Sequence, residues 1–240
     1  MVDQYRGKPR DQAAELLECF IAEQGLRPHQ KLPSERELCQ SWGFSRSTLR
    51  SAIRKLVTEG KLYAKVGSGT YVAPPKLVRN LQDMEKMDRV AQKYGKTLAT
   101  QVLAVEKIEC TKQISRKLKL PLGHRILVLT RLRTIDGVPT LIDTGHLDYD
   151  RFPGLESFDF TVHSLYEILE THYGLNITHG EESISITYAT QREAELLDIP
   201  PESALFFLSG VSHGENDMPV EYFKSVVRSD QIRFSSVLTR

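Results

Sequence analysis

Apolar residues recur at every third or fourth position in the first part of the chain, which predicts helices there. Residues 11–24 place five apolar side chains at the spacing of an amphipathic helix. Gly25 and the two prolines that follow it end this helix. Ser34 and Glu37 have the spacing of a capping box, which predicts a second, short helix over residues 35–41.

A third helix is predicted to begin after Ser45, a capping residue, and to end at Gly60. Its apolar side chains form one stripe, and its polar faces carry Arg46, Ser47, Arg50 and Arg54. Two helices joined by a short turn, the second with basic and hydroxyl side chains near its start, are typical of a helix-turn-helix.

Two short β-type runs follow and surround Gly67-Ser68-Gly69, which predicts a hairpin with a glycine-rich tip. The whole N-terminal pattern is therefore that of a winged helix-turn-helix over residues 1–74. The glycines fit any tight turn. They also leave the tip, next to Lys65, narrow enough to enter a DNA minor groove.

The adjacent prolines after Ala73 and the lack of periodicity predict a linker over residues 75–97. Beyond the linker, strands and helices are expected to alternate. The expected elements are a strand (101–109), a helix (111–120), a hairpin (125–147) turning at Asp136-Gly137, a helix (161–174), a strand (181–189) and a helix (191–199).

A faint internal repeat relates residues 117–142 to residues 196–223. In each copy a helix ends in Leu-x-Leu/Ile-Pro and is followed by a strand, a polar turn with Asp, a proline and a second strand. Two such units predict one antiparallel sheet with helices beside it, an α+β domain over residues 98–240. A cleft between the halves would suit a small molecule.

The chain has 240 residues and a net charge of +1, which hides an asymmetry. Residues 1–79 hold 14 Lys and Arg against 8 Asp and Glu, whereas residues 80–240 hold 18 against 23. A basic N-terminal third indicates a nucleic-acid-binding module. No apolar run could span a bilayer and no secretory signal is evident, so a cytoplasmic location is expected. The three cysteines match no zinc motif and are expected to be buried thiols.

The arginines of the third helix are interpreted as a DNA-reading surface, because no acidic residue four positions away along that helix pairs with Arg46 or Arg50. The alternative is an ordinary solvated face, which is retained for Arg54 as solvent or phosphate contact. Guanidinium groups suit guanine, and hydroxyl groups suit phosphates or base edges. The predicted DNA-contacting residues are Arg36, Ser45, Arg46, Ser47, Thr48, Arg50, Lys65, Gly67 and Gly69.

Residues 32–38 (LPSEREL), 45–50 (SRSTLR) and 67–72 (GSGTYV), with Gly43, Ala52, Leu56 and Glu59-Gly60, resemble the signature of the GntR family of bacterial transcription regulators. The C-terminal pattern is similar to the HutC-type branch, whose UTRA domain has a chorismate-lyase-like α+β fold. The strands argue against the all-helical FadR-type branch. The resemblance implies a homodimer that binds a palindromic operator, usually as a repressor, under control of a small metabolite.

Arg131 and Arg133 lie two residues apart on a predicted strand and so share one face. Two guanidinium groups on one face suit a phosphate or carboxylate ligand. The alternative interpretation is that this strand face is simply exposed to solvent. By resemblance to phosphosugar-responsive members, Asp143, Ser164, Tyr166 and Glu221 are expected to contact the same effector. Asp143 and Val227 depart from the Glu and Tyr of amino-sugar-responsive members, which disfavours N-acetylglucosamine 6-phosphate and leaves another phosphorylated sugar.

No metal or cofactor is expected, since the seven histidines are scattered singly and no nucleophile or acid–base pair is evident. The sequence therefore predicts a non-enzymatic regulator. Two alternatives stay open: the same regulator responding to an organic acid or amino-acid catabolite, and an enzyme with a DNA-targeting domain.

Overall fold

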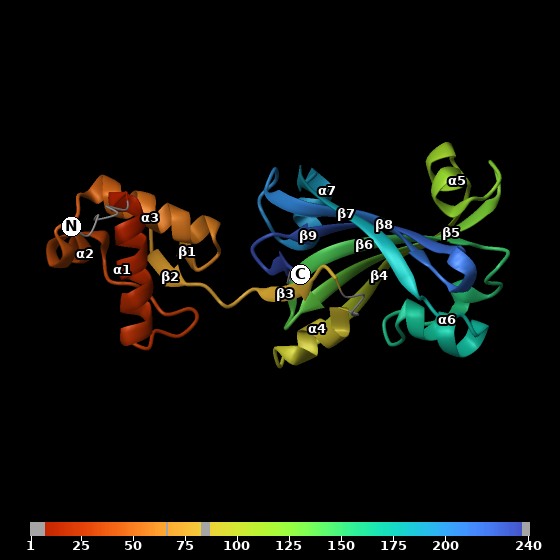
Figure 1. Cartoon of the computed structure of the whole chain (residues 1–240), viewed down its shortest axis with the longest axis horizontal. Coiled ribbons are helices and arrows are strands. Elements are labelled where there is room, and N and C mark those ends of the chain that lie inside the picture. Colours follow the sequence, from red (N-terminus) through yellow and green to blue (C-terminus); the bar gives the residue numbers. More distant parts are fainter. Residues whose placement is uncertain (1–7, 66, 83–86, 237–240) are drawn as a thin grey trace, which may run out of the picture. The chain divides into compact units, whose positions relative to one another are not determined.

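A computed structural model describes residues 8–65, 67–82 and 87–236 (Figure 1). The chain divides into two compact units, residues 1–76 and residues 77–240, and each unit has its own core. No helix in the described part of the chain is long and apolar enough to cross a membrane.

The second and third helices of the first unit begin at the capping residues that the sequence predicts. Its elements are α1 (Pro9–Glu23), α2 (Glu35–Trp42), α3 (Arg46–Thr58), β1 (Leu62–Lys65) and β2 (Gly69–Val72). The Ser34 hydroxyl accepts a bond from the Glu37 amide, and the Glu37 carboxylate accepts one from the Ser34 amide, which confirms the capping box. Ser45 caps α3 by accepting a 3.2 Å bond from the Thr48 amide.

The apolar stripes of α1 and α3 face each other and form the core of the first unit. The largest fully buried side chains there are Leu17, Leu49, Leu56 and Leu62. Trp42, the one tryptophan of the sequence, packs against this core and edge-on to Phe20. Strands β1 and β2 pair as an antiparallel hairpin, and an isolated bridge joins Tyr71 of this hairpin to Lys31. Burial of these stripes explains why the periodic pattern folds as helices.

The second unit is an α+β structure that begins and ends with short strands. Its helices are α4 (Met87–Lys93), α5 (Lys112–Leu118), α6 (Leu165–Tyr173) and α7 (Gln191–Leu197), with 3-10 turns η1 (Leu155–Ser157) and η2 (Glu215–Asp217). Its strands are β3 (Leu77–Asn80), β4 (Leu98–Glu109), β5 (Arg125–Ile135), β6 (Val138–Asp148), β7 (His179–Tyr188), β8 (Ala204–His213), β9 (Pro219–Arg228) and β10 (Ile232–Ser235).

The strand order of the main sheet reflects the internal repeat. Six antiparallel strands run in the order β4-β5-β6-β9-β8-β7. The series β4-α5-β5-β6 corresponds to β7-α7-β8-β9, so the two copies meet where β6 pairs with β9. The hairpin predicted at Asp136-Gly137 joins β5 to β6. The sheet therefore has approximate two-fold symmetry about its centre.

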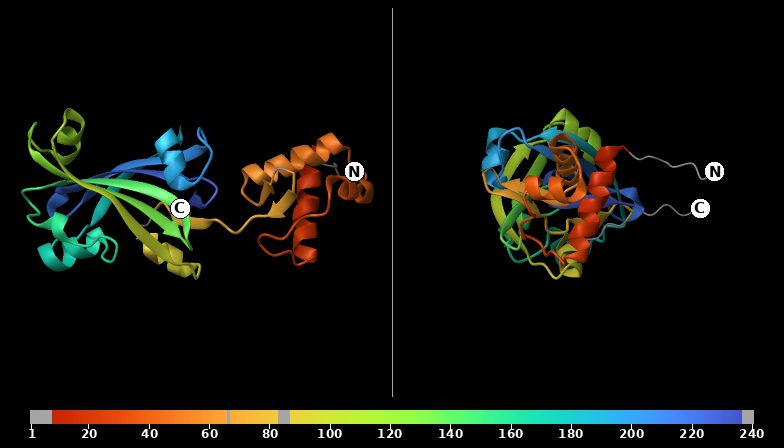
Figure 2. Two further views of the ribbon diagram at one scale, coloured as in Figure 1. Left: turned by 180° about the vertical axis from the view of Figure 1, so that it is seen from behind. Right: turned by 90° about the vertical axis from the view of Figure 1, so that its left-hand side faces the viewer.

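Helices cover both faces of this sheet (Figures 1 and 2). Helices α5 and α7 lie over one face, each above its own apolar cluster. On the other face, α6 packs over one end and α4, β3 and β10 pack over the opposite end. The centre of that second face lies between these two covers, and a cavity opens there.

The structure differs from the sequence-based expectation at two points. Part of the segment expected to be a linker forms β3 and α4, while residues 83–86 lie outside the described residues. Strand β3 forms because it pairs in parallel with β10, from the far end of the domain, a partner that local pattern does not reveal. Among the cysteines, Cys110 is buried as expected, but Cys39 on α2 is only half-buried and Cys19 on α1 is exposed.

Candidate nucleic-acid interface and ligand cavity

The start of α3 presents polar side chains to solvent. Ser45, Arg46, Ser47 and Arg50 are exposed, and Thr48 is half-buried. The Ser45 hydroxyl lies 2.9 Å from the hydroxyls of both Ser47 and Thr48, so these three groups form one cluster at the helix N-terminus. Backbone N–H groups and hydroxyls at such a terminus favour an anion such as a phosphate.

Arg50 is not a free cation, although no acid pairs with it along its own helix. Its Nε donates a 2.7 Å hydrogen bond to Glu35 on α2. The guanidinium side chain remains 65% exposed. In contrast, Arg36 and Arg46 are exposed and have no ion pair with any described residue. The interface therefore contains two unpaired arginines and one that an acid restrains.

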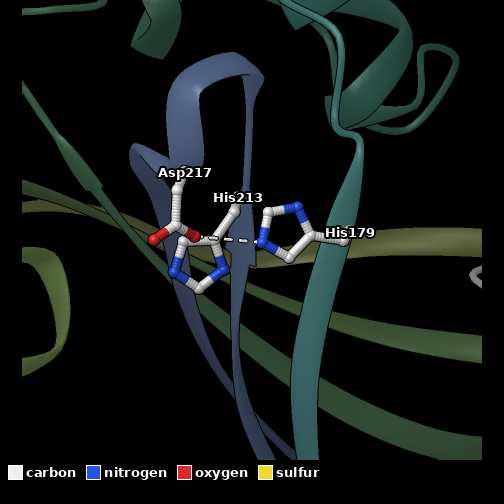
Figure 3. A group of neighbouring side chains, drawn as sticks. All are labelled: His179, His213 and Asp217. Atoms are coloured by element: carbon white, nitrogen blue, oxygen red, sulfur yellow. Dashed lines mark hydrogen bonds and ion pairs between the residues drawn. The ribbon is translucent and has the colours of Figure 1, made fainter.

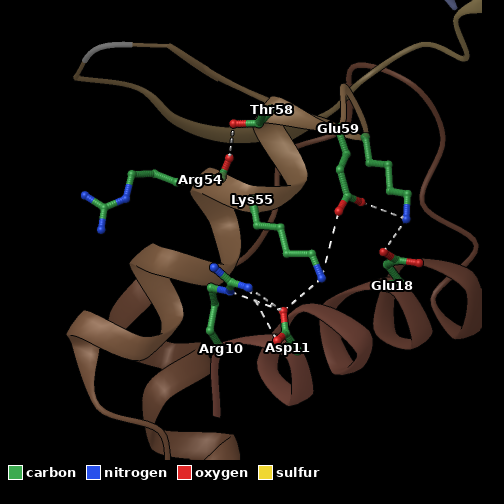
Figure 4. Close-up of polar contacts among 8 residues, drawn as sticks. Arg10, Asp11, Glu18, Arg54, Lys55, Thr58 and Glu59 are labelled. Atoms are coloured by element: carbon green, nitrogen blue, oxygen red, sulfur yellow. Dashed lines mark hydrogen bonds and ion pairs between the residues drawn. The ribbon is translucent and has the colours of Figure 1, made fainter. Parts of the chain in front are cut away.

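The opposite side of α3 is fixed by ion pairs to α1. Lys55 contacts Asp11 at 2.9 Å and Glu59 at 3.9 Å, and Figure 4 shows this network between the two helices. Arg54 extends away from the network in Figure 4 and has no ion pair among the described residues. Lys55 therefore links α3 to α1, whereas the neighbouring Arg54 is exposed to solvent.

The wing tip combines positive φ angles with a cation over aromatic rings. Gly67 has φ of 71° and Gly69 has φ of 124°, which only glycine adopts without strain. The Lys65 ammonium lies 5.4 Å from the ring centre of Tyr71, and Tyr71 stacks on Tyr63 at 5.4 Å. The two tyrosines, which sequence analysis did not single out, hold Lys65 beside the tip.

The second unit contains a cavity of about 960 Å³ on the sheet face between α6 and α4. Its size fits a small organic ligand. All six residues that the sequence predicted for the effector line this one cavity: Arg131, Arg133, Asp143, Ser164, Tyr166 and Glu221.

Arg131, Arg133 and Asp143 form a buried ion-paired group on neighbouring strands. Arg131 pairs directly with Asp143 in the β5–β6 register, and both its Nε (2.9 Å) and its Nη2 contact Asp143 Oδ2. Arg133 Nε donates to Oδ1 of the same carboxylate at 3.2 Å. The side chains are only 6%, 17% and 13% exposed, in the order Arg131, Arg133, Asp143. One acid thus orients two guanidiniums, whose remaining N–H groups have no partner among the described residues.

A second polar group lies in the cavity at the β8–β9 side. The Tyr166 hydroxyl donates a 2.7 Å bond to Glu221 and lies 2.7 Å from the Ser212 hydroxyl. Burial raises the pKa of the Glu221 carboxyl, opposed by the Tyr166 hydrogen bond and by Arg131. Burial also raises the pKa of Tyr166 well above its usual value. Tyr166 is therefore a neutral donor to Glu221, and this group suits ligand hydroxyls.

Two glycines make room for this arrangement. A side chain at Gly145 would place its Cβ 2.3 Å from Glu221 Oε1. At Gly210 a Cβ would lie 2.1 Å from the backbone oxygen of Glu181 and 2.6 Å from the Phe223 ring. Residue 131 aligns with residue 210 of the second repeat, at an offset of 79, and that position is a glycine for steric reasons.

Ser164 begins α6 but does not cap it. Four other helices of the described chain are capped by a hydroxyl, those that follow Ser34, Ser45, Thr111 and Thr190. The Ser164 hydroxyl makes no capping bond to its helix, and the residue lines the cavity. Its hydroxyl is consequently available to a ligand.

Comparison with known proteins matches both units. Residues 9–72 match the bacterial regulatory proteins of the gntR family, and residues 93–233 match the UTRA domain. The chain belongs to the GntR family. This confirms the family resemblance of the sequence and the α+β fold with an N-terminal helix-turn-helix and a C-terminal antiparallel sheet.

Two relatives from Bacillus subtilis illustrate the match. The uncharacterized HTH-type transcriptional regulator YurK is 32% identical over 208 residues, covering 87% of this chain and 86% of its own. The HTH-type transcriptional repressor NagR is 28% identical over 229 residues, covering 95% and 94%. The crystal structure of PhnF from Mycobacterium smegmatis has a TM-score of 0.70 at 27% identity, covering 95% of this chain and 99% of that one.

These relatives are named as regulators or repressors of transcription. This GntR-family chain is accordingly a ligand-responsive transcriptional regulator and not an enzyme. Its winged unit binds DNA, and its UTRA domain binds a small-molecule effector.

Proposed function

We propose that this GntR-family protein is a homodimeric repressor that binds a palindromic operator, and that a sugar phosphate in the UTRA cavity changes its affinity for DNA. The winged domain (1–74) would read DNA in the cytoplasm, and residues 98–240 would bind the effector and form the dimer. One observation supports this class of effector: the guanidiniums of Arg131 and Arg133 line the same cavity as a polar group made of Glu221, Tyr166 and Ser212.

The arginine pair supports an anionic ligand. Asp143 neutralises one of the two positive charges, so the pair keeps a net charge of +1 in a buried setting. The Nη groups of Arg133 and Nη1 of Arg131 are free of described partners and suit the oxygens of a phosphate. Asp143 would then be a positioning residue that holds both guanidiniums in place.

The second polar group supports a polyhydroxylated ligand over a simple acid. Glu221 and Ser212 offer oxygens that accept hydrogen bonds from hydroxyls, and Ser164 offers a further hydroxyl. An organic acid that lacks hydroxyl and amino groups would bind the arginines but would offer these oxygens no hydrogen-bond donor. It remains the second candidate because a carboxylate would bind the arginines equally well.

For DNA, we propose that Arg46 and Arg50 contact base edges or adjoining phosphates. Ser45, Ser47 and Thr48 would meet phosphates at the start of α3, and Arg36 would meet the backbone. Lys65, Gly67 and Gly69 would enter the minor groove at the wing. Because Glu35 restrains Arg50, this arginine would leave or share its ion pair on binding.

The DNA assignment is tested with a duplex selected by the wild-type protein from a random pool. In fluorescence anisotropy, Arg46→Ala should weaken binding and reduce the dependence of log affinity on log salt by about 1. Arg192→Ala, an exposed arginine on α7, is the matched control for charge. If Arg46→Ala behaves like Arg192→Ala, the assignment of α3 is wrong.

The effector assignment is tested by thermal-shift screening of sugar phosphates against organic acids. A sugar phosphate should stabilise the wild type and change its DNA affinity, and Arg133→Ala should abolish both effects. Stabilisation by organic acids alone would replace the sugar phosphate with the second candidate. A response that survives in Arg133→Ala would contradict the anion-binding role of the pair.

A further inference from the structure

Two histidines and an aspartate meet at one end of the β7–β8 pair, outside the arginine and glutamate groups of the cavity. His179 begins β7 and lies directly opposite His213, which ends β8. Asp217 comes from η2 in the turn that follows. One nitrogen of each ring and one carboxylate oxygen all lie within 4.8 Å of one another, and Figure 3 shows the three side chains converging.

The hydrogen bonds of Thr178 favour one tautomer of His179, with the proton on Nδ1. The Thr178 hydroxyl has one hydrogen, which it donates to the backbone oxygen of Gly214 at 3.0 Å. When it donates to this oxygen, it accepts from Nδ1–H of His179, which lies 3.0 Å away. In the neutral ring, Nε2 is then a bare lone pair, 3.1 Å from Oδ1 of Asp217. In this tautomer, a second proton or a metal ion between Nε2 and Oδ1 would relieve the repulsion of the two acceptors.

His213 gives independent support for the metal ion. The residue is 9% exposed, and its ring stacks on the ring of His179 at a centroid distance of 4.9 Å. Its Nδ1 is buried and has no hydrogen-bond partner, one of two such atoms among the described side chains. A buried nitrogen without a partner is costly, and a coordinated ion would satisfy it.

The backbone also holds Asp217 in place at a conformational cost. Asn216 and Asp217 have φ angles of 59° and 58°, in the left-handed region that non-glycine residues rarely adopt. Asp217 is 70% exposed, so burial in a core does not explain its conformation. The turn does bring its carboxylate to His179.

We propose that His179, His213 and Asp217 bind a divalent first-row transition-metal ion such as Zn²⁺. Two imidazoles and a carboxylate are a ligand set for such ions, and Thr178 is the outer partner that orients one imidazole. The exposed sides of His179 and Asp217 leave a coordination position open to solvent. The ion would join the edge strand β7 to the β8–β9 turn.

The other histidine group of the described chain is a weaker candidate. His124 lies 2.7 Å from Asp148 and 3.7 Å from Asp150. There, however, the guanidinium of Arg125 already pairs with Asp150. A side-chain cation thus supplies the positive charge that a metal would bring.

Titration calorimetry of the full chain with Zn²⁺ tests the proposal, using untagged protein previously treated with a chelator. We expect one equivalent to bind to the wild type. His179→Gln and Asp217→Asn, both at exposed positions, should abolish this binding or weaken it more than 100-fold, and Thr178→Val should weaken it about 10–100-fold. His172→Gln, an exposed histidine on α6, is the control and should bind like the wild type.

Binding of Co²⁺ supplies a second readout. Nitrogen and oxygen ligands should give visible d–d bands without the strong near-ultraviolet absorption of thiolates, which excludes the cysteines as ligands. The proposal fails if no stoichiometric binding occurs, if the His179 and Asp217 variants bind like the wild type, or if His124→Gln is the variant that loses the ion. These measurements contain no DNA or effector, so their outcome does not depend on the proposed function.

Discussion

The guanidinium of Arg50 donates a 2.7 Å hydrogen bond to the carboxylate of Glu35, and this bond joins the two helices of the helix-turn-helix. Both side chains are substantially exposed, so the pair contributes little to stability, about 0–1 kcal/mol. Its effect is instead to place a negative charge beside the helix that meets DNA.

Glu35→Gln should therefore tighten DNA binding several-fold at low salt, since it releases Arg50 and removes a charge that repels phosphate. Anisotropy titrations with the selected duplex measure this change. Glu15→Gln on the exposed face of α1 alters the net charge of the same unit equally and serves as the control. Equal effects of the two substitutions would show that Glu35 acts only through net charge.

Arg131→Ala should destabilise the UTRA domain by about 3 kcal/mol. The substitution leaves the buried Asp143 with Arg133 as its one remaining cationic partner among the described residues, and breaking buried pairs costs about 3–5 kcal/mol. In urea unfolding, far-UV circular dichroism should show an earlier transition of the second unit. Fluorescence of Trp42, in the core of the first unit, should keep its midpoint. A shift of the Trp42 midpoint alone would contradict this prediction.

Glu221 should make the UTRA domain less stable as the pH rises. Burial raises its folded-state pKa above the usual value near 4.5, so the folded state binds more protons than the unfolded state between the two pKa values. The contribution of Glu221 to the free energy of unfolding is therefore largest below pH 4.5, and it is lost as the pH rises through the folded-state pKa.

Glu221→Gln should therefore raise the melting temperature at pH 8, with a gain that shrinks as the pH falls toward 4.5. Differential scanning calorimetry at several pH values measures the gain. Glu170→Gln, at an exposed position on α6, should show no such trend. A gain independent of pH would mean that ionisation of Glu221 is not its cause.

Gly145→Ala and Gly210→Ala should both destabilise the sheet, Gly210→Ala by more. At Gly145 the added Cβ meets the end of the Glu221 side chain, whereas at Gly210 it meets backbone and a ring. Overpacking of this kind costs about 1–3 kcal/mol. In a Glu221→Ala background the cost of Gly145→Ala should largely vanish, while that of Gly210→Ala should persist. Additive effects at Gly145 and Glu221 would show that the clash is not between these residues.

Residue spacing predicted contacts that lie within one element and missed ion pairs between elements, whereas the family resemblance selected six residues from several elements that line one cavity. The two-residue spacing of Arg131 and Arg133 puts both on one strand face, and the caps of Ser34 and Ser45 follow from spacing alone. The ion pair of Arg50 joins different helices, so inspection of one helix could not find it.

Pairings between strands far apart in the sequence could not be predicted from local pattern either. His179 and His213 become neighbours through the register of two strands, and their spacing matches no metal motif. Strand β3 exists because it pairs with β10, so its own sequence resembles a linker. The repeat was more informative, because two helix-plus-hairpin copies side by side account for the symmetric strand order.

The pairing of β3 with β10 has a consequence for synthesis on the ribosome. The winged unit is built from contacts among nearby residues, so it can fold soon after it emerges. Strand β3 emerges next but waits for β10, which is the last strand of its domain to be made. During this interval the buried face around Leu77 is uncovered, and a nascent chain stalled before residue 232 would present it to chaperones.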